Sequence, residues 1–180
     1  SFGAGTAIGF FDLTGIEDFT ALNYLDCRNN QLTSLDVSQN TALTYLDCYM
    51  NQLPILDVSQ NTALGGFNCS GNQLTILDVS NNTNLGWVSC NSNLLTCLDL
   101  SQNSVLDSVG CRNNLLEQLN IKNSTPNAIY ATNNNLTCIE ADTLPLTYFE
   151  VDNGVIISTN CNYTNSCFPT TSIEYYSKNK

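Results

Sequence analysis

Apolar residues recur along this chain with a period of 21 positions. Each unit carries an apolar residue at its first, fourth, sixth and eleventh positions, and the first of these is the leucine of Leu22, Leu43, Leu64, Leu85 and Leu106. A fixed period of this size predicts a solenoid, in which each unit buries its apolar face only against its neighbours.

Within each unit, two short segments alternate between apolar and polar residues, as in Leu46-Asp47-Cys48 and Leu56-Asp57-Val58. Alternation with a period of two predicts a short β-strand. Runs of Asn, Ser, Gln and Thr follow each segment, and this composition is typical of turns. We therefore expect an all-β-rich solenoid of about seven turns, or rungs, of 20–21 residues, with short parallel strands on both sides. Little helix is expected outside the N-terminal cap.

The pattern also predicts how the chain is divided, although we expect one domain overall. Residues 1–21 lack the unit and form an N-terminal cap, 22–157 form the solenoid, and 158–180 form a C-terminal cap and tail. Terminal units of solenoids are atypical because their outer face must be polar. Five apolar residues of the first segment are expected to cover the first rung: Phe2, Phe10, Phe11, Ile16 and Phe19.

Two further residue types, cysteine and asparagine, repeat with the leucines inside the unit. The sixth position is cysteine in Cys27, Cys48, Cys69, Cys90 and Cys111. In-register parallel strands keep such side chains ~4.8 Å apart, which is too wide for a disulfide, so we expect buried free thiols. The ninth position is asparagine, and its side chain is expected to bond backbone groups that the tight turns leave unpaired, at Asn30, Asn51, Asn72, Asn93 and Asn114.

The motif L-x-x-L-x-[L/C]-x-x-N-x-L, present from Leu22–Leu32 to Leu106–Leu116, resembles the consensus of the leucine-rich repeat family. The second half of the unit, L-x-x-L-D-[V/L]-S-x-N, resembles the 21-residue bacterial subclass with nested half-repeats, sometimes called the IRREKO type. Similar runs occur in secreted and cell-surface proteins of Bacteroidetes-type bacteria. The resemblance implies a scaffold that binds partners through the sheet formed by its Cys-bearing strands, in a secreted or cell-surface protein.

The resemblance also bears on the cysteines outside the repeat. Leu136-Thr137-Cys138 followed by a later cysteine resembles the C-terminal cap of related secreted repeats, which implies that Cys138 pairs with Cys161 or Cys167. An oxidising compartment favours such a disulfide. Cys97 occupies the column of Cys138 two rungs earlier, ~10 Å away, so these two are not expected to join.

Charge and composition exclude several classes of function. The chain has 16 acidic and 5 basic residues and a net charge of −11, which argues against nucleic acid and favours a neutral or basic partner. No apolar run reaches the ~18 residues of a membrane span, so we expect no membrane insertion. Histidine is absent, which removes the commonest general base and metal ligand. We therefore expect a non-enzymatic protein, and a monomer.

The outward positions of the Cys-bearing strands vary from rung to rung and are rich in aromatic and charged residues. Such residues anchor protein interfaces, and aromatic rings also stack on sugars. They also decorate exposed strands simply because they fit there. We predict an extracellular protein-binding or adhesion module, with a carbohydrate-binding module or a structural spacer as alternatives. The candidate binding residues are Tyr24, Asp26, Arg28, Tyr45, Asp47, Tyr49, Trp87 and Arg112.

A row of carboxylates is predicted on the opposite side of the solenoid, which we call the Asp ladder: Asp36, Asp57, Asp78 and Asp99. Neighbours ~4.8 Å apart repel by about 3–4 kcal/mol at an effective dielectric of 20, so the row needs compensating partners. Hydroxyl groups of the Ser and Thr residues in the turns are the expected donors. Calcium, which favours clustered carboxylate oxygens, is the alternative, and no other cofactor is expected.

Overall fold

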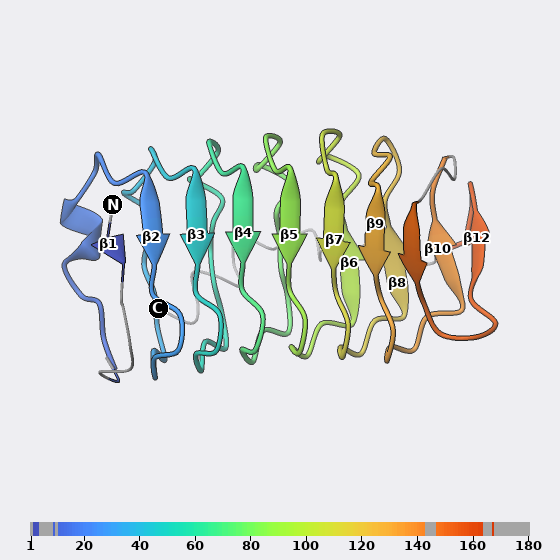
Figure 1. Cartoon of the computed structure of the whole chain (residues 1–180), viewed down its shortest axis with the longest axis horizontal. Helices are drawn as coiled ribbons and strands as arrows, with labels where there is room; N and C mark the ends of the chain where they lie inside the picture. The colour runs from blue at the N-terminus through green and yellow to red at the C-terminus, as the bar shows by residue number, and fades with distance from the viewer. Residues whose placement is uncertain (1, 4–8, 10, 143–146, 164–166, 168–180) are drawn as a thin grey trace.

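The computed structural model is an elongated parallel β-solenoid whose rungs follow one another along a single axis (Figure 1). It describes residues 2–3, 9, 11–142, 147–163 and 167. Within those ranges the one helix is η1, a 3-10 turn at Ile16–Asp18. The sequence therefore predicted the fold class, including the near absence of helix.

Sheet A, an eight-stranded parallel sheet, runs the length of the solenoid in the order β1-β2-β3-β4-β5-β7-β9-β11. From β2 onward it receives one strand from each rung, and equivalent positions are in register, so that Tyr24 lies beside Tyr45 and Asp26 beside Asp47. Its strands are β1 (Phe2–Gly3), β2 (Tyr24–Asp26), β3 (Tyr45–Asp47), β4 (Gly66–Asn68), β5 (Trp87–Ser89), β7 (Ser108–Gly110), β9 (Ala128–Tyr130) and β11 (Tyr148–Glu150).

Sheet B lies on the other side and has four strands, in the order β12-β10-β8-β6. It begins only at the fourth rung, so the prediction of strands on both sides is wrong for the first three rungs. In those rungs a buried asparagine side chain, rather than a neighbouring strand, bonds the backbone carbonyl oxygens. The Asn61 side-chain amide donates to the carbonyl oxygens of Val37 and Asn40 at 2.9 Å each. The strands of sheet B are β6 (Cys97–Asp99), β8 (Gln118–Asn120), β10 (Cys138–Glu140) and β12 (Ile156–Ser158).

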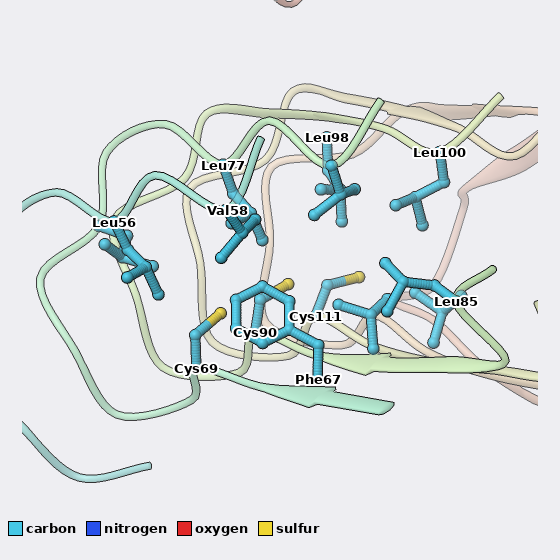
Figure 2. Packing of buried hydrophobic residues seen from close by; sticks show 14 of the residues in the cluster. Leu56, Val58, Phe67, Cys69, Leu77, Leu85, Cys90, Leu98, Leu100 and Cys111 are labelled. Atoms are coloured by element: carbon cyan, nitrogen blue, oxygen red, sulfur yellow. The ribbon is translucent and has the colours of Figure 1, made fainter. Parts of the chain in front are cut away.

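The core lies between the two sides and is built from the repeated leucines and cysteines. Figure 2 shows Cys69, Cys90 and Cys111 in one row, facing Leu77 and Leu98 from the other side. The cysteines of the repeat are free thiols, as predicted, and we call them the Cys ladder. Burial raises the pKa of these thiols because the interior disfavours the thiolate. The members of the Cys ladder are Cys27, Cys48, Cys69, Cys90 and Cys111.

The asparagines of the ninth position join adjacent rungs. The Asn51 amide donates to the carbonyl oxygens of Cys27 and Cys48 at 3.0 Å each, and its side-chain oxygen accepts the Leu32 amide at 3.0 Å. The same contacts recur at Asn72 and Asn93. The predicted structural role is therefore confirmed, since each side chain satisfies buried backbone groups of two rungs.

The N-terminal cap covers the first rung differently from the prediction. Ile16, in η1, is 7% exposed and joins the core, whereas Phe11 and Phe19 are 67% and 62% exposed. Phe2 supplies backbone to β1, which pairs with β2, and Phe10 lies outside the described residues. The prediction that Phe11 and Phe19 cover the first rung is therefore wrong, and Ile16 packs against the core from η1.

Beyond β12, residues 159–163 and Cys167 lie beside sheet B, and we call these described residues the strap. Cys161 is bonded to Cys138, which confirms one of the two predicted pairings. The Tyr163 hydroxyl donates to the Cys138 carbonyl oxygen at 2.7 Å and thereby holds the strap across β10. Cys167 is bonded to Cys97 in β6, a disulfide that the sequence did not predict. Cys161 is bonded at β10 and Cys167 at β6, two rungs earlier, so these two cysteines follow the opposite order to the rungs.

Candidate binding face

Sheet A carries an aromatic row, formed by Tyr24, Tyr45 and Trp87. The rings of Tyr24 and Tyr45 stack face to face, with centroids 4.4 Å apart and planes 3° apart. Trp87 meets Tyr45 edge-on, at 6.0 Å and 61°. Gly66 lies between them in the register and makes room for the indole, because a Cβ there would lie 2.8 Å from the Trp87 Nε1. The three rings are thus fixed by one another and by the missing side chain.

The carboxylates beside this row are less accessible than their outward positions predicted. Asp26 and Asp47 are 6% and 3% exposed. The Arg28 guanidinium lies 2.9 Å from an Asp26 oxygen and 3.8 Å from an Asp47 oxygen, and the two acidic side chains raise its pKa. The Tyr49 amide donates to Asp47 at 3.0 Å. The structure therefore brings these four predicted residues together as one bonded cluster rather than as exposed negative charge.

Tyr45 connects the aromatic row to that cluster. Its hydroxyl lies 3.5 Å from an Asp47 oxygen. Burial, followed by the charge of Asp47, raises the pKa of Tyr45 to about 12. The phenol is therefore protonated at neutral pH and can act as a hydrogen-bond donor.

The middle of the face is polar. The hydroxyls of Ser70 and Ser89 lie 2.8 Å apart, and the Asn91 amide group donates to Ser89 at 2.8 Å. Arg112 lies beyond this region, and its backbone amide donates to the Asn91 side-chain oxygen at 2.7 Å. The structure therefore separates Arg112 from the aromatic row, although sequence analysis grouped them on one face.

Arg112 belongs to a second cluster that sequence analysis missed. Its guanidinium carbon lies 4.5 Å from the centroid of the Tyr130 ring, and a guanidinium nitrogen contacts a Glu150 carboxylate oxygen. This arrangement is a cation–π contact joined to an ion pair. Tyr130 and Glu150 follow the shortened copy of the unit, and the strand pairing Gly110–Tyr130 and Tyr130–Glu150 reveals their common column.

The Asp ladder lies on the other side of the solenoid, and each of its carboxylates bonds its own turn. Asp57 accepts the backbone amide of Ser59 at 2.9 Å, and the equivalent bonds at Asp36, Asp78 and Asp99 measure 2.9–3.0 Å. Hydrogen-bond donors were predicted here, but they are backbone amides rather than hydroxyls. In the part of the chain that the structure describes, no group of three or more Cys, Asp or Glu residues is placed to hold a metal ion.

Comparison with known proteins finds similarity in structure but not in sequence families. No family model and no curated protein sequence matches the chain. The functional domain of InlJ from Listeria monocytogenes, which includes a cysteine ladder, is 26% identical with a TM-score of 0.59, over 74% of this chain and 38% of that one. A leucine-rich repeat protein of Leptospira interrogans is 29% identical with a TM-score of 0.57, over 67% and 34%.

A third structure shows the fold alone. The leucine-rich repeat domain of APL1B has a TM-score of 0.64 at 21% identity, over 74% of this chain and 46% of that one. The chain thus spans less than half the length of each of these structures. Among the described residues, no helix has the length and apolar character that crossing a bilayer requires. The register, the repeated motif and these neighbours together show that the chain folds as a leucine-rich repeat solenoid similar to those of bacterial proteins.

Proposed function

We propose that the chain is an extracellular, non-enzymatic protein-recognition module that binds its partner through sheet A. The observation that carries this proposal is the aromatic row of Tyr24, Tyr45 and Trp87. The ion pair of Arg28 and Asp26 lies beside it. Amphipathic aromatic side chains on a preformed surface are typical anchors of protein interfaces. Because the rings are already ordered, a partner would lose little side-chain entropy on binding them.

The orientation of the rings favours a protein over a sugar. Sugars pack against the open face of an aromatic ring, but the facing surfaces of Tyr24 and Tyr45 are covered by each other at 4.4 Å. The stack also offers ring edges and hydroxyl groups. Edges carry partial positive charge and hydroxyls donate, so both suit the carbonyl oxygens of a partner protein. A carbohydrate-binding module and a structural spacer remain the alternatives.

Location and partner charge follow from separate features. Two disulfides, one at each end of the strap, support an oxidising compartment and hence a secreted or cell-surface protein. The net charge of −11 supports a monomer and a neutral or basic partner. The 21-residue unit with two similar halves supports placement in the nested bacterial subclass of leucine-rich repeats.

The experiment compares two faces of the same molecule on arrays of extracellular proteins and of glycans. Replacement of Trp87 or Tyr45 by Ala is expected to weaken protein binding about 5- to 30-fold, which corresponds to about 1–2 kcal/mol for an interface anchor. The control replaces Asp78 and Asp99 by Asn on the opposite side, where each carboxylate bonds only its turn amide in the described contacts.

The outcomes separate the three candidates. Protein binding that depends on Trp87 and Tyr45 but not on Asp78 and Asp99 supports the proposal. Binding to glycans alone supports the carbohydrate-binding alternative, and binding to neither array supports the spacer. Loss of binding in the control variant with retention in the aromatic variants would show that the wrong face was chosen.

A further inference from the structure

The turn between β11 and β12 contains the one Asn-Gly pair in the sequence, Asn153-Gly154. Both residues are exposed, and Gly154 takes a left-handed φ of 89°. A Cβ at Gly154 would meet no described atom within 4 Å, so nothing described packs against this side of the turn. Among the described residues, the turn is closed by a single backbone bond, from the Val155 amide to the Asp152 carbonyl oxygen at 3.4 Å.

An asparagine followed by glycine reacts readily with its own backbone, since asparagine is thermolabile and glycine adds no side chain that obstructs the attack. The Gly154 nitrogen attacks the Asn153 Cγ, a new N–Cγ bond closes a succinimide ring, and the Cγ–Nδ2 bond breaks. The side-chain nitrogen leaves as ammonia and carries away the proton that the Gly154 nitrogen loses. Water then adds to one of the two ring carbonyls. The product is either an aspartyl residue or an isoaspartyl linkage, in which the main chain continues through Cβ and Cγ.

Hydrogen bonds to either reacting group slow this reaction. A bond from the backbone N–H keeps the attacking nitrogen in place, and a bond from the side-chain amide keeps Cγ in place. Among the described residues, neither the Gly154 N–H nor the Asn153 side chain has such a partner. Both groups can therefore approach each other when the turn fluctuates.

Asn123, which precedes a serine, shows the opposite situation. The Ser124 amide donates to the Ile121 carbonyl oxygen at 3.3 Å, so the nitrogen that would attack is bonded. The Asn123 side chain donates to the Ser101 carbonyl oxygen, also at 3.3 Å. Asn123 is exposed like Asn153, so exposure alone does not distinguish the two positions. The difference lies in the bonds on the two reacting groups.

The other Asn-Ser pairs of the described chain are also restrained. The Asn91 side-chain oxygen accepts the Arg112 amide at 2.7 Å, and the Ser92 amide donates to the Arg112 carbonyl oxygen at 2.8 Å. Asn103 is fully buried. The remaining pair, at 165–166, lies outside the described residues. Asn153 is therefore the described asparagine that combines a favourable neighbour with unrestrained reacting groups.

We propose that Asn153 is a site of spontaneous covalent modification, which deamidates in the folded protein while the restrained Asn-Ser pairs stay intact. The new negative charge lies beside Asp152, whose carboxylate accepts the backbone amides of Asn133 and Asn134 at 3.0 and 2.9 Å. An isoaspartyl linkage also lengthens the main chain between β11 and β12. These are the end strands of sheets A and B and pair on one side only, so the last rung is expected to loosen.

The test follows deamidation of the folded protein by peptide mapping and mass spectrometry at neutral and mildly alkaline pH. Product at position 153 should accumulate several-fold faster than product at Asn91, Asn103 or Asn123. Its rate should rise with pH, because the attacking nitrogen must lose its proton. The Asn153→Gln variant should form far less product there, because ring closure would need one more atom. Equal rates at Asn153 and Asn123 in the folded protein would overturn the proposal.

A matched control separates the turn from the dipeptide. Ser124→Gly gives Asn123 the same glycine neighbour and retains the backbone N–H that bonds Ile121. In the folded variant, Asn123 should still react several-fold more slowly than Asn153, whereas in concentrated urea the two rates should converge. Equal rates in the folded variant would overturn the proposal, because reactivity would then follow the dipeptide alone.

Hydrogen exchange measures the effect on the last rung. The isoaspartyl form, separated by ion exchange, should exchange the amides of β11 and β12 several-fold faster than the unmodified protein, with those of β3 unchanged. The Asn153→Asp variant adds the charge without lengthening the main chain, so its exchange is expected to lie between the two. Equal exchange in the isoaspartyl and unmodified forms would overturn the expected loosening of the rung.

Discussion

The replacement of Gly66 by Ala tests how the aromatic row is built. A Cβ at this position would lie 2.8–2.9 Å from three atoms of the Trp87 indole, Nε1, Cε2 and Cζ2. Ordinary contact begins at 3.4 Å, so the ring must move by at least about 0.6 Å or change rotamer. Gly66 does not take a left-handed φ, so its backbone accepts alanine without strain. The perturbation therefore falls on the indole.

The effect on stability is expected to be small because two contributions oppose each other. Alanine in a strand gains about 0.5–1 kcal/mol over glycine through backbone entropy. Displacement of Trp87 loses its edge-on contact with Tyr45, which is worth about 0.5–1.5 kcal/mol. The free energy of unfolding should therefore change by less than about 1 kcal/mol, while the position of the ring changes clearly.

Fluorescence reports the ring directly, because Trp87 is the one tryptophan in the sequence. The Gly66→Ala variant should shift the emission maximum and raise quenching by acrylamide, and it should weaken partner binding about as much as Trp87→Ala does. Gly65→Ala is the matched control, since a Cβ there meets no atom closer than 3.7 Å. Unchanged emission in Gly66→Ala, or an equal change in Gly65→Ala, would refute the proposed role of Gly66.

Three further predictions concern the scaffold. Asn51→Ala should lower the free energy of unfolding by about 2–4 kcal/mol in urea titrations, because it leaves buried backbone groups unpaired. Asn61→Ala should cost about 1–2 kcal/mol less, because the side-chain oxygen of Asn61 has no described partner. Equal losses in the two variants would contradict this. Burial raises the pKa of Cys27 and Cys90 from 9.0 to about 12. Their contribution to stability should therefore be fully present below about pH 9 and be lost as the pH rises toward 12. A free energy of unfolding that does not change between pH 8 and 10.5 would argue against this. Replacing Cys97 and Cys167 by Ser should lower the free energy of unfolding by about 2–4 kcal/mol. An unchanged melting temperature would show that this disulfide does not stabilise the fold.

The sequence predicted what repetition controls. A residue that returns every 21 positions must occupy the same place in each rung, so the register of sheet A, the burial of Cys48 and the bonds of Asn51 all followed from the period. The stacking of the Cys ladder without disulfides followed from the spacing of parallel strands. These features depend only on a unit and its neighbours.

Features that break the repeat could not be predicted in the same way. Cys161 and Cys167 are bonded to the rungs in reverse order, and no periodic signal marks Cys167 as the partner of Cys97. The copy of the unit that starts at Leu106 is one residue short. Counting in steps of 21 from Gly110 therefore misses Tyr130, whose ring contacts Arg112. The angle of Trp87 depends on the absence of a side chain at Gly66, which is a packing effect between rungs.

The Cys97–Cys167 disulfide also has a mechanical consequence. A pulling force applied on the C-terminal side of Cys167 enters the solenoid at Cys97 and bypasses the intervening chain, a sequence separation of 70 residues. That segment could otherwise extend by roughly 240 Å at about 3.5 Å per residue. While the disulfide is intact, the last rungs cannot be peeled off one at a time under such a load. The protein should therefore transmit tension from that point as a short, stiff element, and lengthen abruptly only when the bond is reduced.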